Sequence, residues 1–190
     1  KRWLEPLLAN EIVSCFSMTE PQGGADPKVF TTRAVREGNE WVISGQKWFA
    51  SNARYAAFYI VMVVTDPDAP PYGRMSMLIV PAGAKGMEIV RNTGWDPSHT
   101  PTHAYMHFDN VRVPASNLLA EEGMGFAIAQ ARLGPGRIHH CMRAIGVAER
   151  ALALMVERAR TRIAFGKPLA EQGMVQHAVA VSRNEIDQAR

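Results

Sequence analysis

The most constraining feature of this 190-residue sequence is a change in its hydrophobic periodicity near Pro114. From about Ser14 to Val113, apolar residues form short runs separated by stretches rich in turn-forming residues, which is typical of β-strands. After Pro114, apolar residues recur at intervals of three and four, which predicts amphipathic helices. We therefore expect an α+β fold, with an antiparallel β-barrel or sandwich followed by the first helices of an α-helical bundle.

The apolar runs also locate individual strands. Strands are expected at residues 58–64, 75–80, 87–90 and 104–108. A hairpin is expected between residues 34–36 and 41–44, across a turn at 37–40.

Helical spacing marks both ends of the chain. The first ten residues predict the end of a helix that begins upstream, and residues 170–190 predict a second C-terminal helical run. The Gly-Pro-Gly at 134–136 is expected to break one helix, and residues 166–168 are expected to break the next. These signals predict three regions, namely the end of an N-terminal helical domain at 1–12, a middle β-domain at 13–114 and an incomplete helical bundle at 115–190.

The two ends suggest a section of a longer protein. The chain starts with Lys1 rather than Met, and it stops at Arg190 within a helical pattern. Two long helices alone would leave wide apolar faces bare, so we expect further helices or an oligomer to cover them.

Composition excludes several classes of protein. The chain has 47% hydrophobic and 21% charged residues, which indicates a globular protein rather than a disordered one. A net charge of +3 does not indicate a nucleic-acid-binding surface, and no apolar stretch has the roughly 18 residues of a membrane span. Cys15 and Cys141 are expected to be buried thiols, which suits the bacterial cytoplasm or the mitochondrial matrix.

Common nucleotide, hydrolase and metal motifs are absent from the sequence. Four local features remain as candidates for a ligand-binding or catalytic site. In the first, residues 16–26, a strand runs into a Gly-rich loop whose backbone can approach a ligand closely, although an ordinary turn is the simpler interpretation. In the second, residues 45–52, Trp48 and Phe49 are expected on opposite faces of a strand. One ring would be core and the other would lie on an aromatic ligand beside Ser51, unless both are core.

The third feature, at residues 133–143, combines the Gly-Pro-Gly with an arginine, Arg137, that opens the next helical run. Its consecutive His139, His140 and Cys141 do not predict a metal site, since ligands on a helix need a spacing of three or four.

The fourth feature, at residues 162–172, is interpreted as a helix end. Arg162 would lie in the last turn, Gly166 would cap the helix and Pro168 would follow it. This is ordinary capping chemistry unless Arg162 also binds a ligand.

Taken in this order, the four segments resemble the acyl-CoA dehydrogenase family, flavoenzymes with an N-terminal helical domain, a middle β-domain and a C-terminal helical bundle. The resemblance rests on TEPQGGAD, GQKWFASN, the arginine-led helix and RIAFGKPL, and it covers nearly the whole chain. The segments LGPGRIHHCMR and FGKPLAEQG are similar to the branch whose animal members ten and eleven carry an added kinase-like domain.

The resemblance implies sites for FAD and an acyl-CoA. It implies flavin contacts at Phe16, Met18, Thr19, Phe49, Ala50 and Ser51, a pyrophosphate contact at Arg162, and adenosine contacts at Phe165 and Gln172. It implies that Ala25, Gly134, Pro135, Gly136 and Arg137 border the acyl-CoA. A guanidinium suits the pyrophosphate because it binds phosphate oxygens in pairs.

Several positions depart from the family pattern. Ala25 stands where many relatives have Ser, Phe49 stands where they have Trp, and Gly173 stands where a Gln often follows. Gly136 occupies the position at which a minority of the family carries a catalytic Glu. We therefore assign no catalytic residue within the chain and expect the base beyond residue 190.

The implied reaction is α,β-dehydrogenation of an acyl-CoA thioester in fatty acid β-oxidation, with α-proton abstraction by a carboxylate and β-hydride transfer to flavin N5. The implied partners are electron-transferring flavoprotein, as electron acceptor, and further copies of the chain in a dimer or tetramer. Two alternatives remain, namely a non-catalytic flavin- or acyl-CoA-binding module, and a flavin monooxygenase or nitroalkane oxidase on the same scaffold. We expect the 190 residues alone to be inactive.

Overall fold

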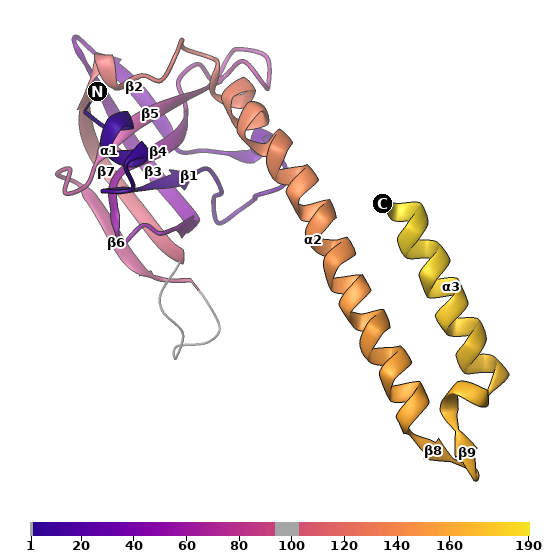
Figure 1. The fold of residues 1–190 in the computed structure, drawn as a ribbon. Helices are drawn as coiled ribbons and strands as arrows, with labels where there is room; N and C mark the ends of the chain where they lie inside the picture. Colours follow the sequence, from indigo (N-terminus) through magenta and orange to yellow (C-terminus); the bar gives the residue numbers. More distant parts are fainter. Residues whose placement is uncertain (1, 94–102) are drawn as a thin grey trace. The chain divides into compact units, whose positions relative to one another are not determined.

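The computed structural model describes residues 2–93 and 103–190 (Figure 1). The chain divides into two compact units, Lys1–Ala129 and Gln130–Arg190, which are described separately. The α+β class expected from the change in periodicity is confirmed, since strands fill the first unit and helices dominate the second.

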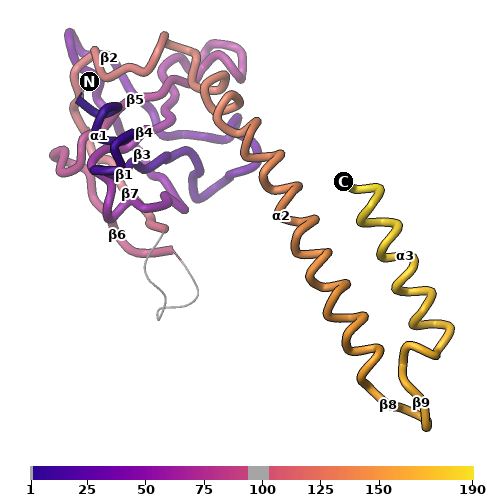
Figure 2. Tube along the Cα trace, in the orientation of Figure 1, coloured from indigo at the N-terminus to yellow at the C-terminus, as the bar shows by residue number. Residues whose placement is uncertain are grey.

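The first unit is built on one curled sheet, visible in the ribbon and in the Cα tube (Figures 1 and 2). Its elements are α1 (Leu4–Leu8), β1 (Val13–Ser17), η1 (Pro27–Val29), β2 (Arg33–Glu37), β3 (Glu40–Ser51), β4 (Ala56–Val64), β5 (Met75–Pro81), β6 (Met87–Asn92), β7 (His103–Pro114) and η2 (Ala115–Asn117). The strand order is β1-β4-β2-β3-β7-β6, with β5 pairing on β4. The strands expected from the apolar runs and the short N-terminal helix are confirmed.

The sheet is mixed rather than purely antiparallel. The expected hairpin between β2 and β3 is present, with Val35 opposite Val42 and Gly38 at φ 61° in the turn. By contrast, β1 pairs with β4 in parallel, from Ser14 opposite Phe58 onward. Periodicity predicts which residues form strands, but not the direction in which strands distant along the chain will pair.

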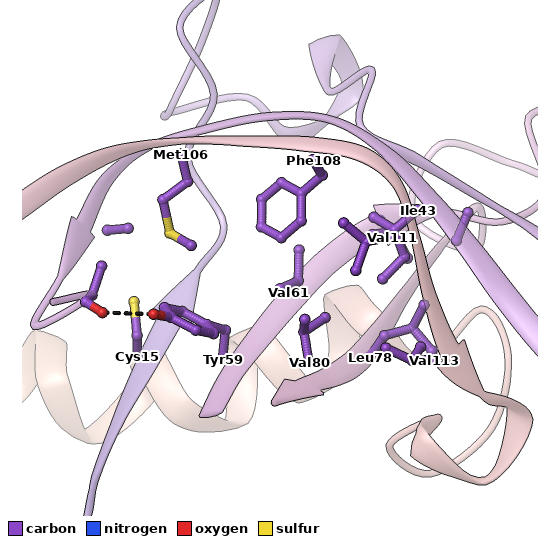
Figure 3. Close-up of a cluster of buried hydrophobic side chains, with 14 of the residues drawn as sticks. Cys15, Ile43, Tyr59, Val61, Leu78, Val80, Met106, Phe108, Val111 and Val113 are labelled. Atoms are coloured by element: carbon purple, nitrogen blue, oxygen red, sulfur yellow. Dashed lines mark hydrogen bonds between the residues drawn. The ribbon is translucent and has the colours of Figure 1, made fainter. Parts of the chain in front are cut away.

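The main core lies within the curl of the sheet. Figure 3 shows side chains from several strands that meet there, and the labelled residues are Cys15, Ile43, Tyr59, Val61, Leu78, Val80, Met106, Phe108, Val111 and Val113. The Tyr59 hydroxyl donates to the carbonyl of Ala53 at 2.7 Å, so its polar end is satisfied. Full burial of side chains of this size stabilises the fold by about 1.5–3 kcal/mol each.

A second cluster of buried side chains lies beside the main core. It consists of Phe30, Met62, Val64, Met75, Met77 and Ala129. Partly buried Phe16 and Met18, from the end of β1 and the residue after it, pack against this cluster. The beginning of the Gly-rich loop is therefore held by hydrophobic contacts.

The second unit contains a helical hairpin. Its elements are α2 (Gly125–Thr161, which begins in the first unit), β8 (Ile163–Ala164), β9 (Lys167–Pro168), η3 (Leu169–Glu171) and α3 (Gly173–Ala189). Ile145 and Leu152 of α2 pack with Ile186 of α3, and Arg183 pairs with Glu149 at 2.8 Å.

The expectation of a helix break at the Gly-Pro-Gly is wrong, because α2 continues through Pro135. A proline in a helix removes one hydrogen bond, here the one that the carbonyl of Ala131 would accept. Ala131 is exposed, so solvent can satisfy that carbonyl and the helix continues at a moderate cost.

Apolar side chains remain exposed on α2, as the sequence pattern leads one to expect. Ile138, Met142, Val147 and Leu154 are between 46% and 71% exposed. No helix among the described residues is both long and apolar enough to cross a membrane.

Candidate functional site

The Gly-rich loop after β1 is joined to β3 by a buried ion pair that sequence reasoning missed. Lys47 Nζ lies 2.8 Å from Glu20 Oε1, and the side chains of the two residues are 0% and 1% exposed. The same Nζ donates to the carbonyl of Met18 at 2.9 Å. Glu20 belongs to the TEP segment and Lys47 to the GQKW segment, so one interaction connects two of the four sequence features.

The Glu20 carboxylate is fully engaged by its surroundings. It accepts hydrogen bonds from the backbone N–H groups of Thr31, at 2.7 Å, and Thr32, at 3.1 Å. The Thr31 hydroxyl and the Gln22 amide also donate to it. A carboxylate with this many donors is a structural acceptor, and it is not available to remove a proton from a substrate.

Burial and pairing set the pKa values of the two groups. Burial alone would raise the pKa of Glu20, but attraction to Lys47 and hydrogen bonds from Lys47, Thr31 and Thr32 hold it below its ordinary value. Burial lowers the pKa of Lys47 to about 8, against the opposing attraction of Glu20. The pair is therefore ionised at neutral pH.

A β-bulge shapes the aromatic end of β3. Lys47 pairs with Met106 and Ala50 with Ala104, so β3 has one extra residue between these pairs. Phe49 adopts φ 55°, a left-handed conformation that is uncommon for a bulky residue. The backbone N–H of Trp48 donates to the carbonyl of Thr19 at 2.8 Å, which places the Gly-rich loop against the bulge.

The expectation that Trp48 and Phe49 lie on opposite faces of a strand is wrong, because the bulge interrupts the alternation. Their rings stack instead, with centroids 5.2 Å apart and an interplanar angle of 6°. Phe49 is 53% exposed, so it is not part of the core. The Trp48 indole Nε1 is buried and has no hydrogen-bond partner among the described residues.

Two hydroxyl-bearing residues adjoin this aromatic pair, since Ser51 follows Phe49 by two residues and the Thr19 carbonyl accepts from the Trp48 N–H. Thr19 is half-buried, Ser51 is exposed, and neither hydroxyl makes a hydrogen bond within residues 2–93 and 103–190. Ala50, between Phe49 and Ser51, is buried in the main core and pairs with Ala104. Ala25 is exposed in the Gly-rich loop.

The sequence-predicted site residues of the first unit therefore gather around one loop and one strand end. The remaining sequence-predicted site residues belong to the second unit, which is described separately.

The segment from Arg162 to Gln172 is a small ribbon rather than a capped helix end. Helix α2 ends at Thr161, and β8 and β9 pair around a turn in which Phe165 and Gly166 have φ of 54° and 80°. The expectation of Gly166 as a helix cap is therefore wrong, since Gly166 and Phe165 provide the two positive φ angles of a tight hairpin turn. Phe165 is 98% exposed at this turn.

The backbone of the ribbon keeps Arg162 close to the following segment. The carbonyl of Arg162 accepts from the N–H of Leu169 at 2.9 Å, and Gln172 begins α3 as its N-cap residue. The side chain of Arg162 is exposed and forms no ion pair within the described part of the chain.

Four of the five residues expected to border an acyl-CoA, Gly134 to Arg137, lie within α2. No atom would contact a Cβ added at Gly134 or Gly136, so this stretch of helix presents open space beside its backbone. Arg137 donates to the side chain of Gln130 at 2.9 Å.

The cysteine expectation is half correct, because Cys15 is buried but Cys141 is exposed on α2. No group of three or more metal-binding side chains occurs in the residues that the structure describes.

The geometry of the first unit suits a planar heteroaromatic ligand. The exposed Phe49 ring lies at one strand end next to Thr19 and Ser51, whose hydroxyls make no hydrogen bond within the part of the chain that the structure describes, and the neighbouring Glu20 carboxylate is neutralised by Lys47. Such a surface can stack on a ring system and donate hydrogen bonds to its edge.

Comparison with known proteins identifies the family of the chain. Residues 15–111 match the family model described as acyl-CoA dehydrogenase, middle domain, and residues 123–190 match acyl-CoA dehydrogenase, C-terminal domain. The chain belongs to the acyl-CoA dehydrogenase family.

Two curated relatives illustrate the similarity. "Probable acyl-CoA dehydrogenase FadE2" of Mycobacterium tuberculosis is 57% identical over 195 residues, which cover 100% of this chain and 47% of that protein. "Acyl-CoA dehydrogenase family member 10" of Mus musculus is 47% identical over 194 residues, which cover 100% of this chain and 18% of that protein. The chain therefore spans less than half the length of these relatives.

Solved structures show the same fold. An acyl-CoA dehydrogenase from Geobacillus kaustophilus superposes with a TM-score of 0.86 at 33% identity, over 98% of this chain and 50% of that one. A glutaryl-CoA dehydrogenase from Mycobacterium smegmatis in complex with FADH2 superposes with a TM-score of 0.82 at 28% identity, over 99% of this chain and 47% of that one.

Proposed function

We propose that this chain forms the flavin-binding part of an FAD-dependent acyl-CoA dehydrogenase that introduces an α,β double bond into an acyl-CoA thioester. Bound FAD would supply the acceptor for the β-hydrogen, which leaves as hydride once a carboxylate has removed the α-proton. The observation that carries the proposal is the group around the β3 bulge, where the Phe49 ring is exposed and the hydroxyls of Thr19 and Ser51 make no hydrogen bond within the described residues.

The residues around the bulge fit an isoalloxazine ring. Phe49 would pack on the ring, and Ser51 would donate to its edge near the reactive nitrogen. Ala50, which is buried in the main core, would fix the strand beside the ring rather than contact it through its side chain. Thr19 would donate to the part of the ring that gains negative charge on reduction, where a preformed donor is most effective. Phe16 and Met18, held against the second core cluster, would fix the approach of this loop.

The second unit supplies residues suited to the rest of FAD. The exposed guanidinium of Arg162 would pair with the pyrophosphate, while Phe165 and Gln172 would line the adenosine. Phe165 is 98% exposed and is therefore available to a partner, so we place the ribbon at the FAD of a neighbouring subunit in a homo-oligomer.

The acyl-CoA would lie beside small residues. Ala25 leaves the loop without a hydroxyl donor, and Gly134 to Gly136 allow a thioester close to the α2 backbone. Arg137 would contribute positive charge to the same surface. We infer electron-transferring flavoprotein as the electron acceptor, and bacterial cytoplasm or mitochondrial matrix as the compartment.

No base is assigned within the chain. Glu20 is paired with Lys47 and engaged by further donors, and position 136 is Gly. We place the base in residues outside these 190, so the chain expressed alone should not turn over an acyl-CoA. These same observations favour a second candidate, a non-catalytic module that binds flavin or acyl-CoA.

The test is anaerobic titration of the full-length protein with acyl-CoA thioesters of different chain lengths. We expect a yellow protein whose visible flavin absorbance bleaches on addition of a suitable thioester, because reduction removes the oxidised flavin bands. Ser51→Ala should slow bleaching. A flavin that remains oxidised with every thioester would favour the non-catalytic module, whereas turnover by the isolated 190 residues would contradict the placement of the base.

A further inference from the structure

We propose that the buried Lys47–Glu20 pair is a positioning device, which fixes the Gly-rich loop against the β3 bulge and thereby aims Thr19 and Phe49 at the flavin. This inference rests on the proposed function and adds to it two residues that do not touch the flavin themselves.

Lys47 and Glu20 lie next in sequence to the contact between the loop and the bulge. Lys47 precedes Trp48 directly, and Glu20 follows Thr19 directly. Between them, the N–H of Trp48 donates to the carbonyl of Thr19 at 2.8 Å. Each member of the pair is therefore one residue from the backbone contact that joins the loop to the bulge. Glu20 is also next to Thr19, and Lys47 is two residues from Phe49.

Lys47 contacts the chain on both sides of Thr19. Its Nζ donates to the Met18 carbonyl at 2.9 Å and to Glu20 Oε1 at 2.8 Å, so one ammonium holds the chain on both sides of Thr19. It also lies 4.9 Å from the centroid of the Phe30 ring, in the second core cluster. The side chain is completely buried, so solvent does not compete for these contacts.

Glu20 contacts both ends of the Gly-rich loop. One oxygen accepts from Lys47 and the N–H of Thr32, while the other accepts from Thr31 and Gln22. The carboxylate thus anchors the far end of the loop, just before β2, as well as the near end. The Gly-rich loop therefore surrounds the Glu20 carboxylate, both oxygens of which accept hydrogen bonds.

Energetics favour positioning over stability as the role of this pair. Burying two charges costs desolvation energy that their attraction only partly repays, so apolar side chains often stabilise a core as well or better. Charged, hydrogen-bonded groups do, however, specify one geometry where apolar packing tolerates several. At this position one geometry matters, because Phe49 must be held at φ 55°, which is unfavourable for its side chain.

The main test variant is the double substitution Lys47→Met with Glu20→Gln in the full-length protein. It removes both charges together, so that no unpaired charge is left buried, and the new amide oxygen can still accept from one of the two N–H groups, of Thr31 and Thr32, that bind separate oxygens of the Glu20 carboxylate. Glu20→Gln alone is the second variant. Arg112→Met is the matched control, because it removes the exposed ion pairs of Arg112 with Glu37 and Glu40 from the same sheet.

We expect the double variant to fold, as judged by circular dichroism and thermal unfolding of the FAD-free protein. Its affinity for FAD should fall by roughly tenfold or more, because displacing a ligand-facing group by a fraction of an ångström has effects of this size. The visible absorbance maxima and the midpoint potential of the remaining bound flavin should shift. With acyl-CoA, kcat should fall while KM changes little, and Arg112→Met should match the parent throughout.

A folded double variant with the parent's FAD affinity, spectrum and potential would overturn the inference, since the pair would then be structural only. Failure of both test variants to fold would also overturn it, because the pair would then maintain the whole unit rather than one loop. Failure of the proposed function has a different signature, in which the unsubstituted protein binds no flavin or is not reduced by any acyl-CoA.

Discussion

Glu20 shows how the role of a single residue depends on its partners. In the sequence it is one acidic residue in a Gly-rich stretch, with nothing to indicate burial. In the structure it accepts from Lys47, Thr31, Thr32 and Gln22. A carboxylate in the proposed flavin-binding loop would otherwise be an obvious candidate for the base, and these contacts remove it from consideration.

The same residue predicts a specific dependence of stability on pH. The pKa of Glu20 in the folded protein is below its ordinary value of 4.5, so its contribution to stability is complete above pH 4.5 and is lost as pH falls below that value. Glu20→Gln should cost about 3 kcal/mol at neutral pH, because it leaves the buried Lys47 charge without its counter-ion.

Urea unfolding of the parent and of Glu20→Gln, at neutral pH and at several values below 4.5, measures this difference. The gap in unfolding free energy should narrow as pH decreases, since protonation removes the same charge from the parent. A gap that stays constant across this range would show that folding does not lower the pKa of Glu20.

At the scale of elements, local chain geometry decides where side chains point. The bulge in β3 brings Trp48 and Phe49 into a stack, although their neighbouring positions predict opposite faces. Helix α2 continues through Pro135, although Gly-Pro-Gly is a strong helix-breaking signal. In both cases the surroundings of the element outweigh a local preference.

The turn that precedes β6 allows a test at this scale. Gly86 has φ 88°, and a Cβ at this position would lie 2.2 Å from the carbonyl oxygen of Asp109. Gly83 has a similar φ of 76°, but a Cβ there would meet nothing within 4 Å. Gly86→Ala should therefore destabilise the first unit by about 3 kcal/mol or more, whereas Gly83→Ala should cost only about 1 kcal/mol.

Chemical denaturation of the two variants under identical conditions measures the contrast. The two glycines share their backbone conformation, so the difference between the variants isolates the contact with Asp109. Equal losses of unfolding free energy would contradict this interpretation.

At the scale of the whole molecule, the proposed FAD contacts come from two compact units, each with its own core. The exposed Arg162 side chain forms no ion pair within the described residues, so it contributes little to the stability of its own unit. If it binds the FAD pyrophosphate, its contribution will appear only when FAD is present.

We therefore predict that Arg162→Ala lowers the affinity for FAD by about 2 kcal/mol, the size of a charge-assisted hydrogen-bonded contact, and leaves the Tm of the FAD-free protein unchanged. Fluorescence titration with FAD and thermal unfolding without FAD give the two values. Arg150→Ala, at an exposed position of α2, is the control and should change neither. A lowered Tm without FAD would assign Arg162 to folding instead.

Much of the fold follows from local patterns in the sequence. The runs at 58–64 and 75–80 become β4 and β5, and the turn at 37–40 closes the hairpin of β2 and β3. These predictions succeed because alternation and turn chemistry act between near neighbours. The family resemblance, carried by four short segments in order, is likewise confirmed by the matches over residues 15–111 and 123–190.

Tertiary structure alone decided the remaining features, because each depends on contacts between residues distant in the sequence. The parallel pairing of β1 with β4, the bulge that exposes Phe49 and the pairing of Glu20 with Lys47 are all of this kind. The sequence by itself determined which segments are strands and helices and to which family the chain belongs. Folding determined which charges are buried together and which ring is left exposed, since desolvation and backbone geometry act only once the chain is packed.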